Sequence, residues 1–251
     1  NLPGGIGTVP IYDEDIFKTQ VVEIANQSPD SRSLIQGWDQ DADLVLVDAH
    51  WDIVFKFSVI SASMHIAKKG LRVLGIAESF SAGKNAILAG VVMRKDLRID
   101  GLSFTTTTVG GMDATDSVIA LYKGLRREDI NLIMISGGVI SWYNIIDPFR
   151  VHHETERGTI IVTYEESGGI EGYIARHFPG DRERIEAYRN LGSRTPVLLH
   201  AEHTIYIRSF GLSEKDAAAV CSDFTYDGRI PEPLRVARLY ARSVMRSILP
   251  G

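Results

Sequence analysis

The sequence predicts an α/β fold in which a mixed β-sheet is flanked by helices. Three strand-like segments follow one another between residues 71 and 109, a pattern typical of an antiparallel meander. A helix-like segment comes next, and the nearly all-apolar segment 130–138 then has the pattern of a buried parallel strand. Helix-like and strand-like segments follow to the end of the chain. These observations favour one sheet that combines antiparallel and parallel strands.

The elements can be placed one by one. The strands of the meander are expected at 71–79, 86–95 and 97–109. The pair Asp100–Gly101 is expected close to a turn. A helix at 114–129 is indicated by Val118, Leu121 and their neighbours at helical spacing. Further strands are expected at 130–138, 159–167, 195–200 and 204–211, and further helices at 168–178, 181–192, 213–224 and 231–249. The order of three strands, a helix, a strand and a helical segment is that of the ribonuclease H-like fold.

Residues 1–63 differ from the rest of the chain in charge and composition. They carry 3 basic and 10 acidic side chains, a balance of −7, whereas residues 64–251 carry 24 basic and 22 acidic side chains, a balance of +2. A polar loop is expected at 26–33, an acidic linker at 36–43, and two strands at 43–49 and 52–60 that pair as a hairpin at His50–Trp51. We therefore predict an N-terminal extension or small accessory segment at 1–63, followed by a domain at 64–251.

Composition narrows the classes of protein to which the chain can belong. Its 251 residues are 44% hydrophobic and 24% charged, which are ordinary values for a soluble globular protein. Cys221 is the single cysteine, so no disulfide can form within the chain, and a cytoplasmic protein is expected. No run of about 18 or more apolar residues occurs, so no membrane partner is expected. The net charge of −5 lowers the expectation of nucleic-acid binding without excluding it.

The segment "TVGGMDATDS", residues 108–117, joins the third strand of the meander to the predicted helix. Asp113 lies one helical turn before Asp116, and acidic residues there suit the start of a helix. We interpret Asp113 first as an N-cap residue, because such a cap stabilises a helix by about 1 kcal/mol. A metal-binding role requires another carboxylate from a neighbouring strand. A phosphate-binding loop is a weaker interpretation, since the segment lacks the lysine and spacing of that motif.

Other candidate residues follow strand ends, where open α/β sheets place their ligands. They are Glu78 after the first strand of the meander, Trp142, Tyr143 and Asn144 within 135–147, and Glu165 and Glu166 within 163–169. Trp142 and Tyr143 can stack on a base, although packing in the core is an equal alternative. Glu78 can equally be an exposed residue at a strand end, and the loop around Glu166 can have a capping role.

Arginines recur along the predicted C-terminal helix. Arg235, Arg238, Arg242 and Arg246 are spaced by three, four and four residues, which places them along one face of the helix. Such a stripe can follow a phosphate backbone, and each neutralised phosphate adds salt dependence to binding. The alternative is a solvated face whose aliphatic stems cover apolar surface.

Five stretches together resemble a known family. They are "RVLGIAESF", "TVGGMDATDS", "SGGVISWYNIID", "TYEESGGIEGYI" and "GRIPEPLRVARLYAR", and they fall in order between residue 65 and about residue 248. This pattern resembles the archaeal domain-of-unknown-function family ninety-nine, which is regarded as similar to endonuclease V within the ribonuclease H-like superfamily. The resemblance implies an endonuclease that acts on nucleic acid with deaminated bases.

The resemblance also implies a catalytic site built on Mg²⁺ or Mn²⁺. In such nucleases, carboxylates converge on cations that lower the pKa of an attacking water and stabilise the departing oxygen of a phosphodiester. Carried over to this sequence, the catalytic residues are Glu78 and Asp113 as metal ligands, with Asp116 or Glu166 assisting. The expected nucleic-acid-binding residues are Trp142 and Tyr143 on the base-recognition side, Asn144 beside them in the sequence, and Arg235, Arg238 and Arg242 at the phosphates.

Two positions depart from the family pattern. Many relatives have two aspartates where this chain has Ala77 and Glu78, and adjacent strand residues point to opposite faces of a sheet. The "DG" that follows the fourth strand in endonuclease V corresponds here to Ser136–Gly137, which has no carboxylate. These departures support one alternative to the enzyme, a non-catalytic nucleic-acid-binding module. The apolar loop 138–146 supports another, a small-ligand or nucleotide-binding protein whose pocket this loop forms.

Overall fold

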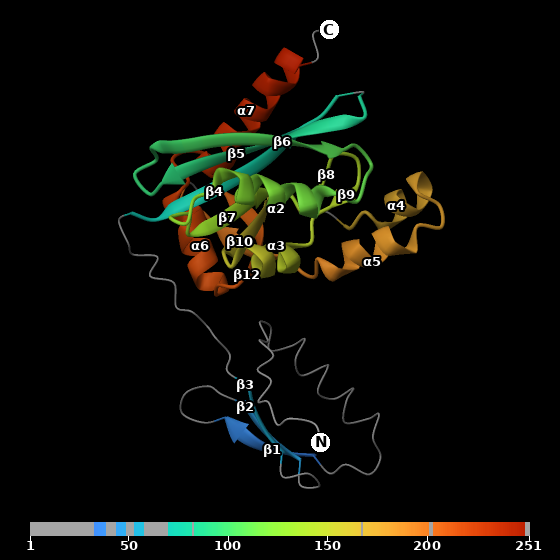
Figure 1. The fold of residues 1–251 in the computed structure, drawn as a ribbon, viewed down its shortest axis with the longest axis vertical. Helices are drawn as coiled ribbons and strands as arrows, with labels where there is room; N and C mark the ends of the chain where they lie inside the picture. Colours follow the sequence, from blue (N-terminus) through green and yellow to red (C-terminus); the bar gives the residue numbers. More distant parts are fainter. Residues whose placement is uncertain are drawn as a thin grey trace. The chain divides into compact units, whose positions relative to one another are not determined.

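The computed structural model describes residues 70–248, apart from 82, 167, 201 and 202, together with the backbone of three strands nearer the N-terminus. The chain divides into two compact units, Asn1–Ala62 and Ser63–Gly251. Each unit has a β-sheet of its own (Figure 1).

The smaller unit contains a three-stranded antiparallel sheet in the order β1-β2-β3. Its strands are β1 (Ser33–Trp38), β2 (Leu44–Asp48) and β3 (Ile53–Phe57). Asp48 pairs with Ile53, which confirms the predicted antiparallel pairing of these two strands. The prediction of loop and linker around β1 is wrong, because this segment pairs with β2. Leu34 and Ile35 stand among polar residues and glycine there, so the segment lacks the alternation by which a strand is recognised.

The larger unit is built on a seven-stranded sheet in the order β11-β12-β10-β7-β4-β5-β6. Its strands are β4 (Arg72–Ser79), β5 (Asn85–Arg94), β6 (Ile99–Thr108), β7 (Leu132–Ser136), β10 (Gly158–Thr163), β11 (Thr195–Leu198) and β12 (Thr204–Phe210). Strands β4, β5 and β6 form the predicted antiparallel meander, and β4, β7 and β10 run parallel. Strand β12 is antiparallel to both β10 and β11. The turn between β5 and β6 precedes Asp100–Gly101, which lies within β6 beside a shift in register.

Six helices are described in this unit. They are α2 (Ala114–Leu125), α3 (Pro148–Thr155), α4 (Glu171–His177), α5 (Arg182–Asn190), α6 (Glu214–Asp223) and α7 (Glu232–Ile248). Helix α2 ends four residues before its predicted end, because Arg126 adopts a left-handed conformation with φ of 50°. Helix α3 was not predicted, although Asp147 caps it by accepting a hydrogen bond from the Arg150 amide and Pro148 begins it.

The sheet separates two apolar cores. Val73 and Ala77 of β4 face the core that packs against α6 and α7, whereas Leu74 and Ile76 face the core beneath α2 and α3. A Cβ added at Gly75 would lie 2.4 Å from the Cβ of Pro233, so glycine is required where α7 approaches the sheet. The mixed sheet with helices on both faces is the predicted fold class (Figure 1).

The parallel strands decide where the site lies. Strands β4, β7 and β10 all end at the same edge of the sheet, so the segments that follow them meet there. The segment after β7 forms a short hairpin of β8 (Val139–Ile140) and β9 (Asn144–Ile145), which was not predicted. Among the described residues, no helix combines the length and the apolar character needed to cross a membrane.

Candidate functional site

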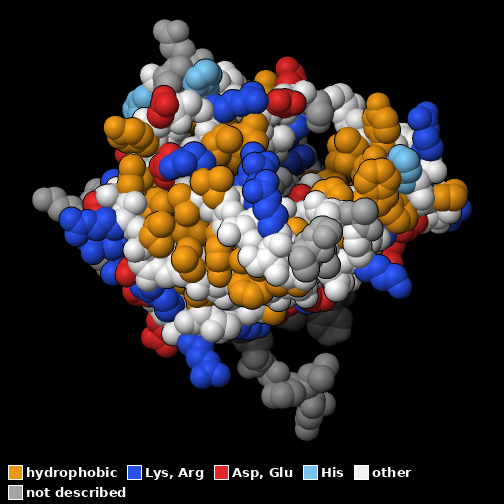
Figure 2. Space-filling model, turned by 90° about the horizontal axis from the view of Figure 1, so that it is seen from above, with side chains coloured by type: hydrophobic (Ala, Val, Ile, Leu, Met, Phe, Trp, Pro, Cys, Tyr) orange, Lys and Arg blue, Asp and Glu red, His pale blue; other side chains and the backbone are white. Residues whose placement is uncertain are grey.

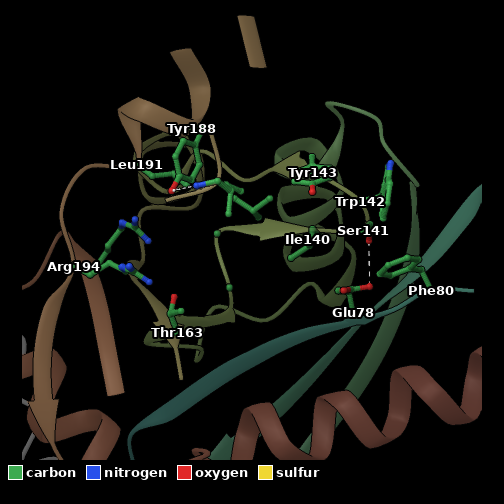
Figure 3. A pocket seen from close by; sticks show the side chains of 15 residues that line it. Glu78, Phe80, Ile140, Ser141, Trp142, Tyr143, Thr163, Tyr188, Leu191 and Arg194 are labelled. Carbon is green, nitrogen blue, oxygen red and sulfur yellow. Dashed lines mark hydrogen bonds between the residues drawn. The ribbon is translucent and has the colours of Figure 1, made fainter. Parts of the chain in front are cut away.

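A pocket of about 360 Å³ opens where β4, β7 and β10 end (Figure 3). Glu78 and Phe80 line it beside the end of β4, and Ile140 forms part of its apolar wall. Other lining residues are Ser141, Trp142, Tyr143, Thr163, Tyr188, Leu191, Arg194 and Arg208. An apolar hollow with a few polar groups at its wall is the usual form of a ligand site.

The turn between β8 and β9 carries two aromatic side chains to this pocket. Ser141, Trp142 and Tyr143 all have positive φ, at 41°, 62° and 64°. Such backbone costs of the order of 1–3 kcal/mol at each non-glycine residue, and it persists where surrounding contacts hold it. The strands pair on either side of the turn, and the Gly110 amide donates to the Ser141 carbonyl at 2.8 Å. Strain of this kind is common at ligand-binding positions.

The aromatic side chains of the turn belong to a larger cluster. The Trp142 ring lies 5.4 Å from the ring of Tyr143 and 4.9 Å from that of His177, measured between centroids. Tyr143 stacks on His177 at 5.6 Å with an angle of 27° between the rings, and Phe178 meets Tyr143 edge-on. Trp142 is still 48% exposed. Its exposed surface is therefore available to a flat ligand, whereas Tyr143 is held mainly by its neighbours.

Arg184 links this turn to the glycine turn after β6. It is 4% exposed, and its guanidinium donates to the carbonyls of Gly110 at 3.0 Å, Gly111 at 2.8 Å and Tyr143 at 2.6 Å. It also pairs with the Asp181 carboxylate at 3.0 Å. Sequence reasoning missed this residue, because nothing in the pattern of 181–190 distinguishes Arg184 from the exposed arginines of the same helix.

Asp113 stands at the start of α2, but its side chain does not cap the helix as predicted. Instead, its carboxylate accepts hydrogen bonds from the Thr107 hydroxyl at 2.9 Å, from the Thr108 amide at 3.1 Å and hydroxyl at 2.8 Å, and from the Asn144 amide at 2.7 Å. Burial opposes ionisation of Asp113, but the hydrogen bonds from Asn144, Thr108 and Thr107 outweigh it and hold its pKa below the usual range. Asp113 therefore joins β6 to the β8–β9 hairpin.

Asn144 takes the capping role instead. Its side-chain oxygen accepts from the Ala114 amide at 3.0 Å, at the first residue of α2. Its NH₂ group donates to Thr107, Thr108 and Asp113. Asn144, which was expected among the nucleic-acid-binding residues, is fully buried. The cap lies 30 residues away in sequence, which is why the local pattern did not reveal it.

Glu78 is placed differently from Asp113. It lies at the pocket wall, where its carboxylate accepts one side-chain hydrogen bond, from the Ser141 hydroxyl at 3.2 Å (Figure 3). Burial raises the pKa of Glu78 above its usual value, against the opposing effects of Ser141 and of the positive charge of Arg238. Among the described residues, no hydrogen bond or ion pair joins Glu78 to Asp113.

The two reserve carboxylates, Asp116 and Glu166, have hydrogen-bond partners of their own. Asp116 is exposed on α2 and pairs with Arg150 of α3 at 2.5 Å. Glu166 follows β10 and accepts a hydrogen bond of 3.4 Å from the Tyr206 hydroxyl. Within the described part of the chain, neither shares a hydrogen-bond partner with Glu78 or Asp113.

The described residues do not fit the expected carboxylate site for Mg²⁺ or Mn²⁺. No group of three or more His, Cys, Asp or Glu side chains among them is arranged to hold a metal ion. Ala77 is buried in the core, and the Ser136 hydroxyl accepts a hydrogen bond of 3.0 Å from the Arg238 guanidinium. The cationic Arg238 side chain thus lies at the end of β7, the position that corresponds to the "DG" of endonuclease V.

The arginines of α7 fall into different environments. Arg238 is half-buried, and its guanidinium lies 5.3 Å from the centre of the Tyr164 ring as well as on Ser136. Arg235 pairs with Glu232 on the same helix. Arg242 and Arg246 are exposed and line a shallow hollow near the end of α7. Lys and Arg side chains stand among hydrophobic ones on the face seen in Figure 2.

Comparison with known proteins identifies relatives of the larger unit. The family model for endonuclease dU matches residues 69–245. A UPF0215 protein of Pyrobaculum calidifontis is 37% identical over 176 residues, which cover 68% of this chain and 95% of that protein. The crystal structure of a protein of unknown function from Archaeoglobus fulgidus has a TM-score of 0.60 at 25% identity, and the match covers 72% of this chain and 99% of that chain.

A more distant structure shares the fold. Endonuclease V of Ciona intestinalis, in complex with a 24mer DNA containing an inosine followed by a ribo-adenosine, has a TM-score of 0.50 at 15% identity. The match covers 94% of this chain and 98% of that chain. This likeness confirms the predicted ribonuclease H-like fold of the endonuclease V type.

Proposed function

This chain belongs to the endonuclease dU family, and on that premise we propose that it recognises a deaminated base in nucleic acid. The observation that carries the proposal is the pocket at the ends of β4, β7 and β10, with Trp142 and Glu78 on its wall. We assign this activity to residues 64–251 and regard residues 1–63 as an accessory segment.

The walls of the pocket suit a flat heterocycle. Trp142 is 48% exposed and Phe80 is 42% exposed, so each offers ring surface on which a base can stack. Stacking of a base on an aromatic side chain contributes about 1–3 kcal/mol. Enzymes and readers that act on a single base take it out of the helix into a pocket of this kind. A base in this pocket would meet apolar surface on its faces and polar groups along its edge.

Glu78 supplies a physical reason for a preference for deaminated bases. Deamination converts a ring nitrogen that accepts a hydrogen bond into an N–H that donates one, in both cytosine and adenine. An ionised Glu78 accepts from the N–H of uracil or hypoxanthine, whereas the lone pair of the unmodified base faces the carboxylate and is repelled. The Ser141 hydroxyl holds the Glu78 carboxylate at the wall of the pocket.

The exposed arginines of α7 are the proposed contacts for phosphates outside the pocket. Arg242 and Arg246 face solvent and line the same hollow. Contacts from such side chains strengthen binding without selecting a sequence, and they weaken as salt rises. Arg238 has another role in this proposal, because its hydrogen bond to Ser136 and its charge hold the strand end beside Glu78.

Phosphodiester cleavage is the second candidate function. The family assignment and the position of Glu78 at the end of β4 favour it, and the endonuclease V likeness suggests a divalent cation. The described carboxylates do not converge on one site, so Glu78 is the residue to which we assign the candidate catalytic role.

The test compares binding and cleavage in the same samples. Single- and double-stranded oligonucleotides that differ in one base (uracil against cytosine, hypoxanthine against adenine) are measured in EDTA for binding and in Mg²⁺ or Mn²⁺ for cleavage. We expect the deaminated base to bind about tenfold more tightly, which corresponds to about 1.4 kcal/mol. Glu78→Gln should remove that preference, and the exposed control Glu183→Gln should keep it.

Each outcome decides between the candidates. Equal binding of deaminated and unmodified bases by the natural sequence would contradict base recognition. Nicking that requires the metal ion and is lost in Glu78→Gln would establish the nuclease. If the protein prefers the deaminated base but does not nick the strand, it is a recognition module and not a nuclease. Guanine, which also carries a ring N–H, serves as the control that separates hydrogen-bond recognition from the size of the pocket.

A further inference from the structure

Three polar side chains meet on the α7 side of the sheet, at the edge where the pocket opens. The Arg238 guanidinium donates to the Ser136 hydroxyl at 3.0 Å, and it lies 5.3 Å from the centre of the Tyr164 ring. The hydroxyl oxygens of Ser136 and Tyr164 lie 3.3 Å apart. All three residues are partly exposed, so a ligand from solution can contact them. We call Ser136, Tyr164 and Arg238 the Arg238 cluster.

The Arg238 cluster adjoins the pocket in which the base is proposed to bind. In the chain, Ser136 and Tyr164 are each next to a residue that lines this pocket. The positive charge of Arg238 also acts on Glu78 at the pocket wall, where it opposes the effect of burial on the pKa. A base carries its phosphates on its sugar, so a base held in the pocket leaves them outside it. The phosphates of such a nucleotide therefore lie at the edge of the sheet that carries the Arg238 cluster.

Arg238 differs from the neighbouring arginines in its charge partners. Arg229 pairs with Glu165 at 3.3 Å, and Arg235 pairs with Glu232 on the same helix. Among the described residues, Arg238 forms no ion pair. Its one side-chain hydrogen bond among these residues uses one of the five N–H groups of the guanidinium. Several donors of a charged group therefore remain for a ligand.

The chemistry of the Arg238 cluster suits an anion and not a metal ion. Ser136 stands where endonuclease V has the aspartate of its "DG", and Ala77, the other departure from the family pattern, is buried on the same side of the sheet. The cluster itself contains no carboxylate, and its guanidinium repels a divalent cation. Burial raises the pKa of Tyr164, so its hydroxyl keeps a proton that it can donate. Guanidinium and hydroxyl groups are donors that proteins use for phosphate oxygens.

We propose that the Arg238 cluster binds a phosphodiester of the nucleic-acid strand directly, beside the nucleotide whose base occupies the pocket. The guanidinium supplies the positive charge that the resemblance to metal-dependent nucleases assigns to a cation, and the hydroxyls add hydrogen bonds to the phosphate oxygens. This inference rests on the proposed function and deepens it, because it adds one strand phosphate to the recognition of the base. Binding of the strand then requires no divalent ion.

The experiment combines a change in the protein with a change in one phosphate. A single-stranded oligonucleotide with one uracil and no terminal phosphate is compared with two copies, in which the phosphate on the 5′ or the 3′ side of the uracil is a neutral methylphosphonate. Fluorescence anisotropy in EDTA gives the affinities of the natural sequence, Arg238→Gln and Arg98→Gln. Arg98 is 78% exposed in the turn between β5 and β6, at the opposite end of the strands, so its variant controls for the loss of one positive charge.

We expect one of the two methylphosphonates to weaken binding by the natural sequence about tenfold, the scale of one hydrogen bond between charged groups. Arg98→Gln should show the same loss. Arg238→Gln should bind the unmodified strand about tenfold more weakly and lose nothing further with that methylphosphonate, because the two changes remove the same contact. It should also reduce the slope of log affinity against log salt by about 0.7, the value for one phosphate of a single strand.

A second variant keeps the test decisive if Arg238→Gln does not fold. Tyr164→Phe retains the ring beside the guanidinium and removes the hydroxyl, so it should lose about threefold in affinity and show the same dependence on the methylphosphonate. Adding Mg²⁺ should not strengthen binding by the natural sequence. Tighter binding in Mg²⁺ than in EDTA would contradict the role of the guanidinium as the cation of this edge.

The inference and the proposed function fail in different ways. Additive losses from Arg238→Gln and from each methylphosphonate would overturn the phosphate site, even if uracil is preferred to cytosine. Equal affinities for uracil and cytosine strands would contradict base recognition, while the dependence of Arg238→Gln on the methylphosphonate can still be measured on either strand. No binding of either strand by the natural sequence would contradict both.

Discussion

Asp113 and Glu78 were both expected to be metal ligands, and the structure places them in different environments. Asp113 accepts hydrogen bonds from Thr107, Thr108 and Asn144, and thereby connects β6 to the β8–β9 hairpin. Glu78 accepts one side-chain hydrogen bond from Ser141 and faces the pocket. The pKa of Asp113 is lowered by its hydrogen bonds despite burial, and that of Glu78 is raised by burial.

The difference shows what makes a carboxylate available for chemistry. A carboxylate whose lone pairs are already occupied by donors has little left for a ligand, and its removal disturbs the fold. A carboxylate that is partly desolvated and sparsely bonded keeps its acceptor sites free for a substrate. By this criterion Asp113 is a structural residue, and Glu78 is the functional candidate.

The largest expected effect on stability comes from Arg184, which bonds the backbone near both Asp113 and Glu78. Its guanidinium bonds the Gly110 and Gly111 carbonyls beside Asp113 and the Tyr143 carbonyl beside Glu78. Arg184→Met leaves these acceptors without their donor and removes the ion pair with Asp181, which keeps only its hydrogen bond from the backbone amide of residue 184. We expect a loss of about 3 kcal/mol in the free energy of unfolding, measured by urea denaturation.

Arg182→Met is the matched control for that measurement. Arg182 lies two residues away on the same helix and is exposed, so its loss should change the free energy of unfolding by about 0.5 kcal/mol or less. If both variants lose the same stability, Arg184 does not link the two turns in the way its hydrogen bonds indicate.

Asp113→Asn and Glu78→Gln test the comparison directly. Each substitution keeps the shape of the side chain and removes its charge. At position 113 the new NH₂ group meets the donors of Thr108 or Asn144, so a loss of about 2 kcal/mol in the free energy of unfolding is expected. At position 78 a partly buried charge is removed, so the change should stay within about 0.5 kcal/mol. Urea titrations at neutral pH measure both values.

The reverse ranking would refute the division of roles. If Glu78→Gln destabilises the protein more than Asp113→Asn, the Glu78 carboxylate is the structural one. In that case the loss of base preference in Glu78→Gln could no longer be attributed to replacing the carboxylate by an amide that can both donate and accept. The stability measurement therefore comes before the binding measurement.

The sequence was sufficient to predict the strands whose hydrophobic pattern is visible within the segment itself. The meander of β4, β5 and β6 and the all-apolar strand β7 have patterns that arise from burial on one or both faces of a sheet. The sequence also predicted that Glu78 and Trp142 lie at the same edge of the sheet, because the ends of parallel strands meet there. Both residues line the pocket at that edge.

The contacts that determine the roles of the site residues could not be predicted from local sequence patterns. The Asn144 cap of α2 and the carbonyls bound by Arg184 come from segments 30 or more residues away. An aspartate at the start of a helix has the same local pattern whether its side chain caps the helix or turns back to β6. In the structure, the β8–β9 hairpin packs against the glycine turn, and the Asp113 side chain therefore bonds Asn144 and β6 instead of capping the helix.

The smallest expected effect is the dependence of stability on pH, and the two carboxylates should contribute with opposite signs. The lowered pKa of Asp113 adds stability above its ordinary pKa of 3.8, and this contribution is lost as pH falls through the folded-state pKa. The raised pKa of Glu78 has the opposite effect, since the stability that it adds is present below its ordinary pKa of 4.5 and is lost as pH rises through the folded-state pKa.

The signs can be separated by difference curves from urea denaturation at a series of pH values. The advantage of the natural sequence over Asp113→Asn should shrink as the solution becomes acidic, whereas its advantage over Glu78→Gln should shrink as pH rises above 4.5. Each amplitude should be about 1 kcal/mol or less, since both groups keep contact with solvent. Curves that slope in the same direction would mean that hydrogen bonding does not lower the pKa of Asp113, or that burial does not raise the pKa of Glu78.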